Sequence, residues 1–434
     1  MKINTNNKRI ATLIALIIAG ETVFFFPFVL ARIFRPTLLA VYDISNTELG
    51  SYFSVYGVVA MLSYFFGGPL ADKFSARYLI SWALFLTAIG GFVLWVVPIK
   101  STLFLLYAFW GLTTILLFWA ALIRATREWG NISMQGRAFG WLDGGRGAVA
   151  AILGTLTLFV FSDFNPDNLH FANIQDERIR VFKNVILFTT MFTLFSGVLV
   201  WWFVPNNKET RLTERVQLSQ MFVLLKLPSV WLISVIIICA YVGYKITDDF
   251  SLYANQVLGF NEFKSAVFGT ASLWMRAVIA ILAGYLADKV SASKILSLGF
   301  VITFLGALLV ASGLIETALV FVIINLAFVM IGVYGVRALY FTLIQEANLP
   351  IYYTGTVVGI VSVLGFTPDV FMSPWMGYLL DINPGAIGHR YVFFVLAMFT
   401  LFGFFASKLF IRHNKSKFNL SVLNKLSSIN NSSK

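Results

Sequence analysis

Apolar segments long enough to cross a lipid bilayer recur along the whole chain. A hydrocarbon core of ~30 Å needs roughly 20 apolar residues per helix, and such segments run from about residue 10 to about residue 411. With 59% apolar and only 12% charged residues, a soluble fold of 434 residues would lack polar surface. The first segment is too long for a signal-peptide core, so we expect it to be retained. The sequence therefore predicts an all-α integral membrane protein.

Twelve segments fit this description, and a polar stretch divides them into two sets. Their expected bounds, good to about four residues, are 10–35, 46–68, 78–98, 102–125, 136–161, 183–204, 229–257, 262–287, 294–314, 317–343, 353–380 and 390–411. We predict an N-terminal six-helix bundle over 1–205, a cytoplasmic linker over 206–228 and a C-terminal six-helix bundle over 229–412. The tail, 413–434, is rich in Asn, Ser and Lys and is expected to be disordered.

The distribution of basic residues indicates the orientation of the chain. If the N-terminus is cytoplasmic, the inner segments carry 20 Lys and Arg and the outer ones 8, which agrees with the positive-inside rule. Both termini are therefore predicted to be cytoplasmic, with the protein in the cytoplasmic (inner) membrane. This topology accounts for most of the net charge of +12, so a nucleic-acid partner is not indicated. The one cysteine, Cys239, and three scattered histidines suggest neither disulfides nor a metal, and no cofactor is expected.

An internal repeat is the sharpest motif in the chain. The loop "GPLADKFSAR" (Gly68 to Arg77) between the second and third segments returns as "GYLADKVSASK" (Gly284 to Lys294) between the eighth and ninth. The two copies are about half the chain apart, so duplication of a six-helix unit is the simplest explanation. Paired halves with a site at their interface are a recurring transporter design.

The repeated loop resembles the signature of the major facilitator superfamily. That signature has a glycine, a small apolar pair, an aspartate, a basic residue and a second basic residue, which Gly68, Asp72, Lys73 and Arg77 match, while Ser75 stands where the family often has a second glycine. The resemblance covers the whole layout of the chain. It implies the major facilitator fold, with a small-molecule substrate moved by alternating access, and we expect a monomer in contact with membrane lipid. The implied gating residues are Asp72, Lys73, Arg77, Arg127, Glu128, Asp288 and Lys289.

Charged residues within the spans point to the functional centre, because each costs at least ~2.5 to 3.5 kcal/mol at a helix centre. They are Glu21, Asp143, Arg146, Lys245, Asp248, Asp249, Arg276, Arg337 and Asp369. Either they line a central cavity or they neutralise one another as buried pairs, and both readings stay open. Glu21, Asp248 and Asp369 are the candidates for a coupling proton, since burial favours the neutral form of a carboxyl.

Within the superfamily, the sequence is most similar to the organophosphate:phosphate antiporter group. Arg32 falls near the group's substrate-binding arginine once a gap of about three residues is allowed, and Arg146 stands where the group uses a histidine. The segment 249–251 resembles the group's Asp-Trp-Ser element, whereas Tyr244 occupies the position of the group's second arginine. The candidate substrate-binding residues are thus Arg32, Arg146, Tyr244, Lys245 and Arg276.

These patterns predict a secondary active transporter of a small organic solute, with an organic anion favoured, coupled to a counter-anion or to protons. Two alternatives stay open: a membrane solute sensor of the same fold that does not transport, and a proton-coupled carrier of amino acids or other neutral metabolites. An enzyme is not expected, because the sequence has no nucleotide-binding glycine loop, metal cluster or nucleophile with a base. An ion channel is disfavoured because the gate motif occurs in both halves.

Overall fold

The computed structural model describes residues 5–130, 135–163, 174–206, 224–316, 318–347 and 354–415. Most of these residues are helical and none lies in a strand, and they contain 12 stretches long and apolar enough to cross a membrane. The prediction of an all-α protein with twelve spans is thereby confirmed. The first span continues to Tyr42, beyond its predicted end. Most of the predicted linker and nearly all of the predicted tail lie outside the described residues.

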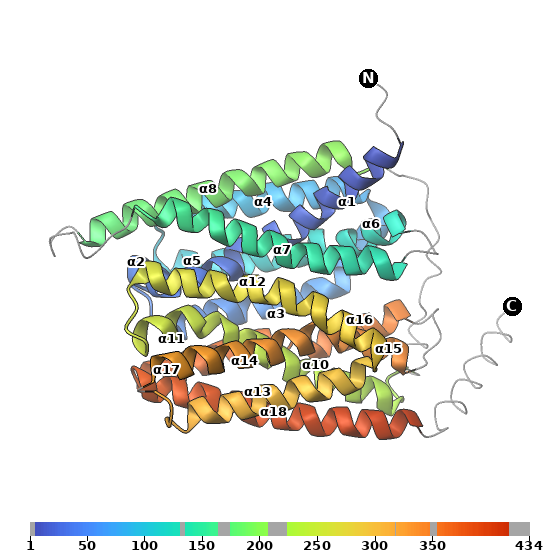
Figure 1. Cartoon of the computed structure of the whole chain (residues 1–434). Coiled ribbons are helices and arrows are strands. Elements are labelled where there is room, and N and C mark those ends of the chain that lie inside the picture. The colour runs from blue at the N-terminus through green and yellow to red at the C-terminus, as the bar shows by residue number, and fades with distance from the viewer. Residues whose placement is uncertain are drawn as a thin grey trace, which may run out of the picture. The chain divides into compact units, whose positions relative to one another are not determined.

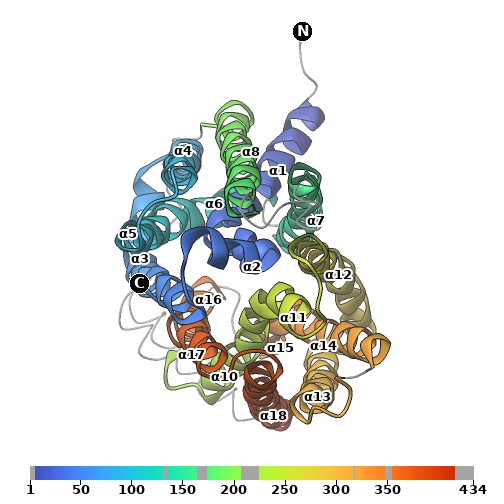
Figure 2. The same cartoon turned by 90° about the vertical axis from the view of Figure 1, so that its left-hand side faces the viewer.

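The chain divides into two compact units, of which the first contains Met1–Arg211, Thr247–Ala277 and Asp369–Gly388. Within it, α4 runs along α8, and α1 lies against α7 and α8 (Figure 1, Figure 2). Its elements are α1 (Thr5–Thr22), η1 (Phe25–Val29), α2 (Leu30–Tyr42), α3 (Asn46–Lys73), α4 (Ala76–Trp95), α5 (Lys100–Gly111), η2 (Leu112–Trp119), α6 (Ala120–Gly130), α7 (Gln135–Phe161), α8 (Ile174–Phe203), η6 (Thr247–Asp249), α11 (Phe250–Gln256), the first half of α12 (Glu262–Lys289) and most of α17 (Pro368–Ile382).

The second unit contains Leu212–Ile246, Val278–Pro368 and His389–Lys434. Here α13 packs along α14, while α10 lies against α14 and α16 (Figure 1). Its elements are α10 (Pro228–Ile246), the end of α12, α13 (Ala292–Ala311), α14 (Leu319–Leu339), η7 (Tyr340–Thr342), α15 (Leu343–Glu346), α16 (Thr354–Gly365) and most of α18 (Ala386–Lys415). Because the first unit also takes parts of the seventh, eighth and eleventh spans, the division into bundles of six helices stays a prediction.

The first span is interrupted between α1 and α2. Pro27 lacks a backbone N–H and cannot donate to the preceding turn, and a π-helical turn, η1, surrounds it. The backbone leaves helical geometry again at Phe34, with φ −113° and ψ 32°, two residues before Pro36. Irregular backbone at membrane depth is tolerated only where protein buries it, and Phe25, Phe26, Pro27 and Val29 are indeed buried. The span therefore consists of helical segments that are interrupted twice, by the buried π-helical turn η1 and by the kink at Phe34.

Glycines allow α3 and α17 to approach each other closely within the first unit. A Cβ added at Gly50 would overlap the backbone of Ser373 and Pro374, and one at Gly377 would overlap the backbone of Asn46. At Gly57 the added atom would lie 2.9 Å from the carbonyl carbon of Asp369. Small residues at a contact between membrane helices permit such backbone approach, so these three glycines set the distance between the second and eleventh spans.

Candidate functional site

Three spans bring a buried carboxylate between two arginines in the first unit. Glu21 stands in the last turn of α1, and only 2% of the residue is exposed. Its Oε1 accepts a hydrogen bond from Arg276 of α12 at 3.2 Å. Its Oε2 lies 3.4 Å from Nε of Arg146 on α7. The residues predicted separately for coupling (Glu21) and for substrate binding (Arg146, Arg276) therefore form one ion cluster, called here the Glu21 cluster.

The pair between Glu21 and Arg146 is loose. Neither Oε2 of Glu21 nor Nε of Arg146 has a hydrogen-bond partner among the described residues, although both atoms are buried. Gly20 leaves room for the Arg146 side chain, since a Cβ there would lie 3.1 Å from its Cδ. The Arg146 guanidinium also lies 5.5 Å from the ring of Phe24 and 5.6 Å from that of Trp119. Arg146 is thus held by packing and by ion pairs with Glu21 and Asp143, while its Nε makes no hydrogen bond among the described residues.

One side of the Glu21 cluster reaches accessible surface. Asp143, one helical turn before Arg146 on α7, places a carboxylate oxygen 3.9 Å from the guanidinium, and its side chain is 59% exposed. Among the described residues, nothing lies within 4 Å of a Cβ added at Gly140 or Gly144 of the same helix. Two buried arginines thus face one buried carboxylate, and an exposed carboxylate lies beside Arg146. An excess of buried positive charge suits an anionic ligand.

Arg32, also predicted to bind substrate, belongs to a second cluster. Its Nε donates to Oδ1 of Asp248 at 2.7 Å, and both side chains are almost completely buried. Arg35 lies one turn further on, donates to Oδ1 of Asn46 at 3.0 Å and places NH1 3.5 Å from the carbonyl oxygen of Asp248. Arg35 is 1% exposed, whereas the predicted end of the first span had placed it at the outer boundary. The apolar run after Pro36 was the signal that the span continues.

Further contacts tie the ends of the first and second spans to later spans of the same unit. Asp381 of α17 accepts hydrogen bonds from the backbone N–H groups of Asn46 and Thr47 at 3.1 and 2.7 Å, in the first turn of α3. Thr37 donates to Glu262 at 2.6 Å, and Arg178 of α8 donates to the same carboxylate at 2.8 Å. No sequence signal points to these contacts, because acids at helix ends look like ordinary surface charges.

The remaining predicted binding and coupling residues lie elsewhere. Tyr244 and Lys245 belong to α10 in the second unit, where the Arg337 guanidinium lies 3.7 Å from the centre of the Tyr244 ring. Lys245 is 1% exposed. Asp369 is buried at the start of α17, against Gly57 of α3. Their predicted roles stay predictions.

The predicted gate residues form different contacts in the two repeats. In the first unit Glu128 pairs with Arg124 at 2.7 Å, and Arg124 also donates to the carbonyl of Ala71. The predicted partner, Arg127, is exposed. In the second unit, Glu346 accepts from the backbone N–H of Ser293 at 3.2 Å, at the start of α13.

The basic members of the gate motif lie at helix ends. Lys73 and Lys289 are exposed, as is Asp288, and Lys289 lies 4.4 Å from the Tyr285 ring centre. Arg77 donates to the carbonyl of Val204. The side chain of Asp72 lies outside the described residues. The gating assignment therefore stays a prediction.

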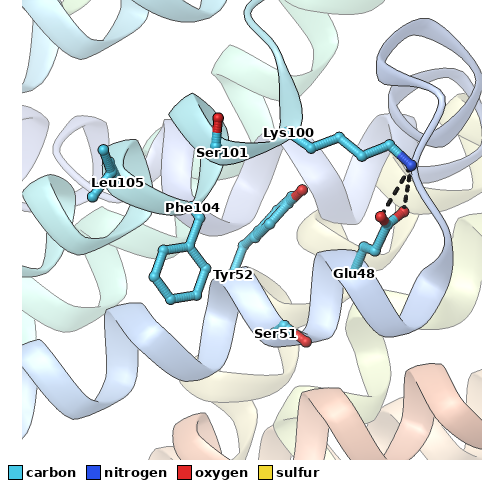
Figure 3. A pocket seen from close by; sticks show the side chains of 7 residues that line it. All are labelled: Glu48, Ser51, Tyr52, Lys100, Ser101, Phe104 and Leu105. Atoms are coloured by element: carbon cyan, nitrogen blue, oxygen red, sulfur yellow. Dashed lines mark hydrogen bonds and ion pairs between the residues drawn. The ribbon is translucent and has the colours of Figure 1, made fainter.

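A groove of about 530 Å³ on α3 and α5 is a further candidate ligand site in the first unit (Figure 3). Two of its lining residues are charged and form an ion pair. Nζ of Lys100 lies 3.0 Å from Oε1 of Glu48, and both side chains are well exposed. Aromatic side chains of Tyr52 and Phe104 form much of the rest (Figure 3). Among the described residues no cluster of His, Cys, Asp or Glu could hold a metal ion. The Glu21 cluster is accordingly the strongest candidate site.

Comparison with known proteins identifies relatives over most of the chain. A sequence model of the Major Facilitator Superfamily matches residues 10–368. The inner membrane protein YqcE of Escherichia coli K12 is 31% identical over 80% of this chain and 81% of its own length. The inner membrane protein YihN of the same strain is 26% identical over 93% of this chain and 96% of its own length.

Solved structures share the fold. A bacterial homologue of the human lysosomal transporter Spinster, crystallised inward-facing and occupied, superimposes with a TM-score of 0.72 at 15% identity, covering 94% of this chain and 98% of that chain. A mutant of the nucleoside transporter NupG gives a TM-score of 0.68 at 13% identity, covering 93% of this chain and all of that chain. At such identities the likeness shows the fold alone. The similarity to organophosphate:phosphate antiporters is not tested by these matches and stays a prediction.

Proposed function

Because the chain belongs to the Major Facilitator Superfamily, we propose that it carries a small organic anion across the inner membrane by alternating access. Its family, its inner-membrane relatives and its structural likeness to transporters make it a multi-pass membrane transporter and not an enzyme. The anionic substrate and the residues that bind it are the proposal. A single observation carries it: Arg146 and Arg276 converge on one buried carboxylate, Glu21.

Arg146 and Arg276 are the proposed anion contacts. A guanidinium presents a rigid set of N–H donors that matches a carboxylate or phosphate group, and its charge acts strongly where water is scarce. Both arginines are more than nine-tenths buried. The Phe24 and Trp119 rings beside Arg146 fix its position without neutralising its charge. A neutral sugar or nucleoside needs no such pair of buried cations.

The contacts of Arg32 and Arg35 with Asp248 and Asn46, called here the Arg32 cluster, fit a gate better than a substrate-binding site. Arg32 and Asp248 belong to the first and seventh spans, and Asp381 joins the eleventh span to the second. If the repeat defines two bundles that rock against each other, these contacts connect one bundle to the other and must break in each transport cycle. The positive-inside rule predicts that these helix ends lie on the outer side of the membrane. We therefore assign Arg32 to the outer gate.

Uptake by the purified protein in liposomes tests the proposal. Radiolabelled lactate, malate and glycerol phosphate serve as anionic probes, with uridine and alanine as neutral ones. We expect uptake of at least one anion, and Arg146→Ala should reduce its rate at least tenfold while expression stays normal. Arg180→Ala is the matched control, because Arg180 is an exposed arginine paired with Glu177 one turn earlier on α8.

Each other outcome has a defined meaning. Uptake of only uridine or alanine would support a carrier of neutral metabolites. Probe binding without uptake by the wild type would support a sensor of the same fold. Unchanged anion uptake by the Arg146 variant would remove Arg146 from the site.

A further inference from the structure

We propose that Glu21 is a tethered counter-ion that occupies the anion site when the substrate is absent and accepts a proton when the anion displaces it. This inference rests on the proposed function and adds the identity of the coupling ion: one proton travels in the same direction as the anion. It starts from the geometry of the Glu21 cluster, in which the carboxylate contacts two arginines from two other spans.

When no substrate is bound, the Glu21 carboxylate already occupies the anion site. Two buried guanidinium groups without a counter-charge are strongly unfavourable, because each ion has lost its hydration. Glu21 supplies the missing charge from α1, and only 2% of the residue is exposed. A carrier without substrate can therefore change between its outward-facing and inward-facing states while Glu21 remains paired with Arg146 and Arg276. It does not require an exchanged anion on the return step.

The geometry of the ion pair between Glu21 and Arg146 allows an incoming anion to open it. Oε2 of Glu21 and Nε of Arg146 lie 3.4 Å apart, and neither has a hydrogen-bond partner in the described part of the chain. In a second buried pair of the unit, Nε of Arg32 lies 2.7 Å from Oδ1 of Asp248 in a hydrogen bond. An incoming carboxylate or phosphate group would therefore find an unused N–H at Arg146, next to the exposed side chain of Asp143.

Charge balance links the anion to a proton. The buried part of the empty cluster holds two positive groups and one negative group, and the exposed carboxylate of Asp143 lies beside Arg146. When a singly charged anion takes the place of Glu21 on the arginines, two negative groups lie close together, and this favours protonation of the displaced carboxylate. With a proton on a Glu21 carboxyl oxygen, the net buried charge equals that of the empty cluster. The proton enters from the side that delivers the anion and leaves with it on the other side.

No other charged group described near Glu21 takes this role. The side chain of Asp143 is 59% exposed, so it is not a buried counter-charge like Glu21. From α8, Ser196 faces the neighbouring Thr22, and η2 contributes the uncharged Trp119 beside Arg146. The nearest basic residue of α6 in the gate region, Arg124, bonds with Glu128 and with the carbonyl of Ala71. The charges that face Glu21 are thus Arg146 from α7 and Arg276 from α12.

Anion binding at a series of pH values tests the inference. Whichever of lactate, malate or glycerol phosphate the wild type transports is titrated by calorimetry in two buffers of different ionisation enthalpy. The wild type should take up about one proton per bound anion, so that affinity rises about tenfold per pH unit of acidification. Glu21→Gln should bind the anion with a flat pH profile and exchange it across liposomes, but lose the net uptake driven by a proton gradient.

Controls keep the outcome decisive. Glu316→Gln makes the same change in a partly buried acid paired with Arg390 in the second unit, and it should retain the wild-type pH slope. Glu21→Asp, which keeps the carboxyl group, should also retain that slope. A wild type that binds the anion without taking up a proton overturns the inference even if Glu21→Gln does not fold. The same applies if Glu21→Gln keeps the wild-type slope, whereas absence of all anion binding contradicts the proposed function itself.

Discussion

The ion pair between Arg32 and Asp248 offers a quantitative test of how buried charges hold the first unit together. The change is a set of three variants: Arg32→Met, Asp248→Leu and the double variant. Each single change leaves one charge buried without its partner, because the two side chains are 1% and 0% exposed. The double change replaces both charges by apolar groups of similar length.

The expected size follows from burial and geometry. Breaking a buried pair by removing one partner costs about 3 to 5 kcal/mol. Arg35 places its guanidinium 3.5 Å from the backbone carbonyl of Asp248, so in Arg32→Met it partly compensates the remaining acid. We therefore expect about 3 kcal/mol for that variant and about 3 to 5 kcal/mol for Asp248→Leu, which removes the acceptor of the Arg32 hydrogen bond. The double variant should recover at least half of the larger loss, because apolar replacement of a whole pair is often close to neutral.

Thermal unfolding in detergent, followed by tryptophan fluorescence, measures these differences. For a chain of this length, the entropy of unfolding converts 3 kcal/mol into a Tm decrease of roughly 3 °C. In a double-mutant cycle the two single changes should not add, with a coupling energy above ~1 kcal/mol. If the double variant loses as much as both singles together, the side chains do not interact, and the assignment of Arg32 to this pair is refuted.

Three further predictions concern the helix ends and the glycine contact. Asp381→Ala removes the acceptor of two backbone N–H groups in the first turn of α3, so hydrogen exchange there should become at least several-fold faster, and unchanged exchange would contradict the capping role. Gly377→Ala should destabilise the protein by about 1 to 3 kcal/mol through overpacking against Asn46, whereas Gly359→Ala, with open space around its Cβ among the described residues, should leave Tm unchanged. Asp72→Asn should slow the transport cycle without weakening binding, so a raised KM at normal kcat would count against its gating assignment.

The overall architecture followed from the sequence because a bilayer imposes a simple requirement on length and polarity. Each span can be recognised from consecutive residues, because it is an apolar run that ends at polar residues, as do the runs that end near Trp95 and Phe203. The loop sequence around Asp72 is repeated around Asp288. Neither feature needs long-range contacts. The end of the first span was misplaced because Arg32, Arg35 and Pro36 resemble a membrane boundary, whereas buried partners in fact satisfy both arginines.

Pairing of the charges could be predicted only in part. The sequence placed Glu21, Arg146 and Arg276 within spans, but which way each helix faces depends on tertiary packing. Glu21 and Arg276 are separated by 255 positions, so no local pattern shows that they meet. The acid of the pair with Arg32 was equally hidden among Asp248, Asp249 and Asp369. The role of Asp381 was missed because its partners are backbone groups, which carry no sequence signal.

The interruption of the first span has a mechanical consequence. A regular helix transmits torsion because each N–H is bonded to the carbonyl four residues earlier. Around η1 that spacing changes: the N–H of Phe24 bonds to Glu21, three residues back, and that of Val29 bonds to Phe24, five residues back. Twisting of α1 at Glu21 is therefore absorbed before it reaches Arg32 on α2. One span thus carries two ion pairs that can open at different moments.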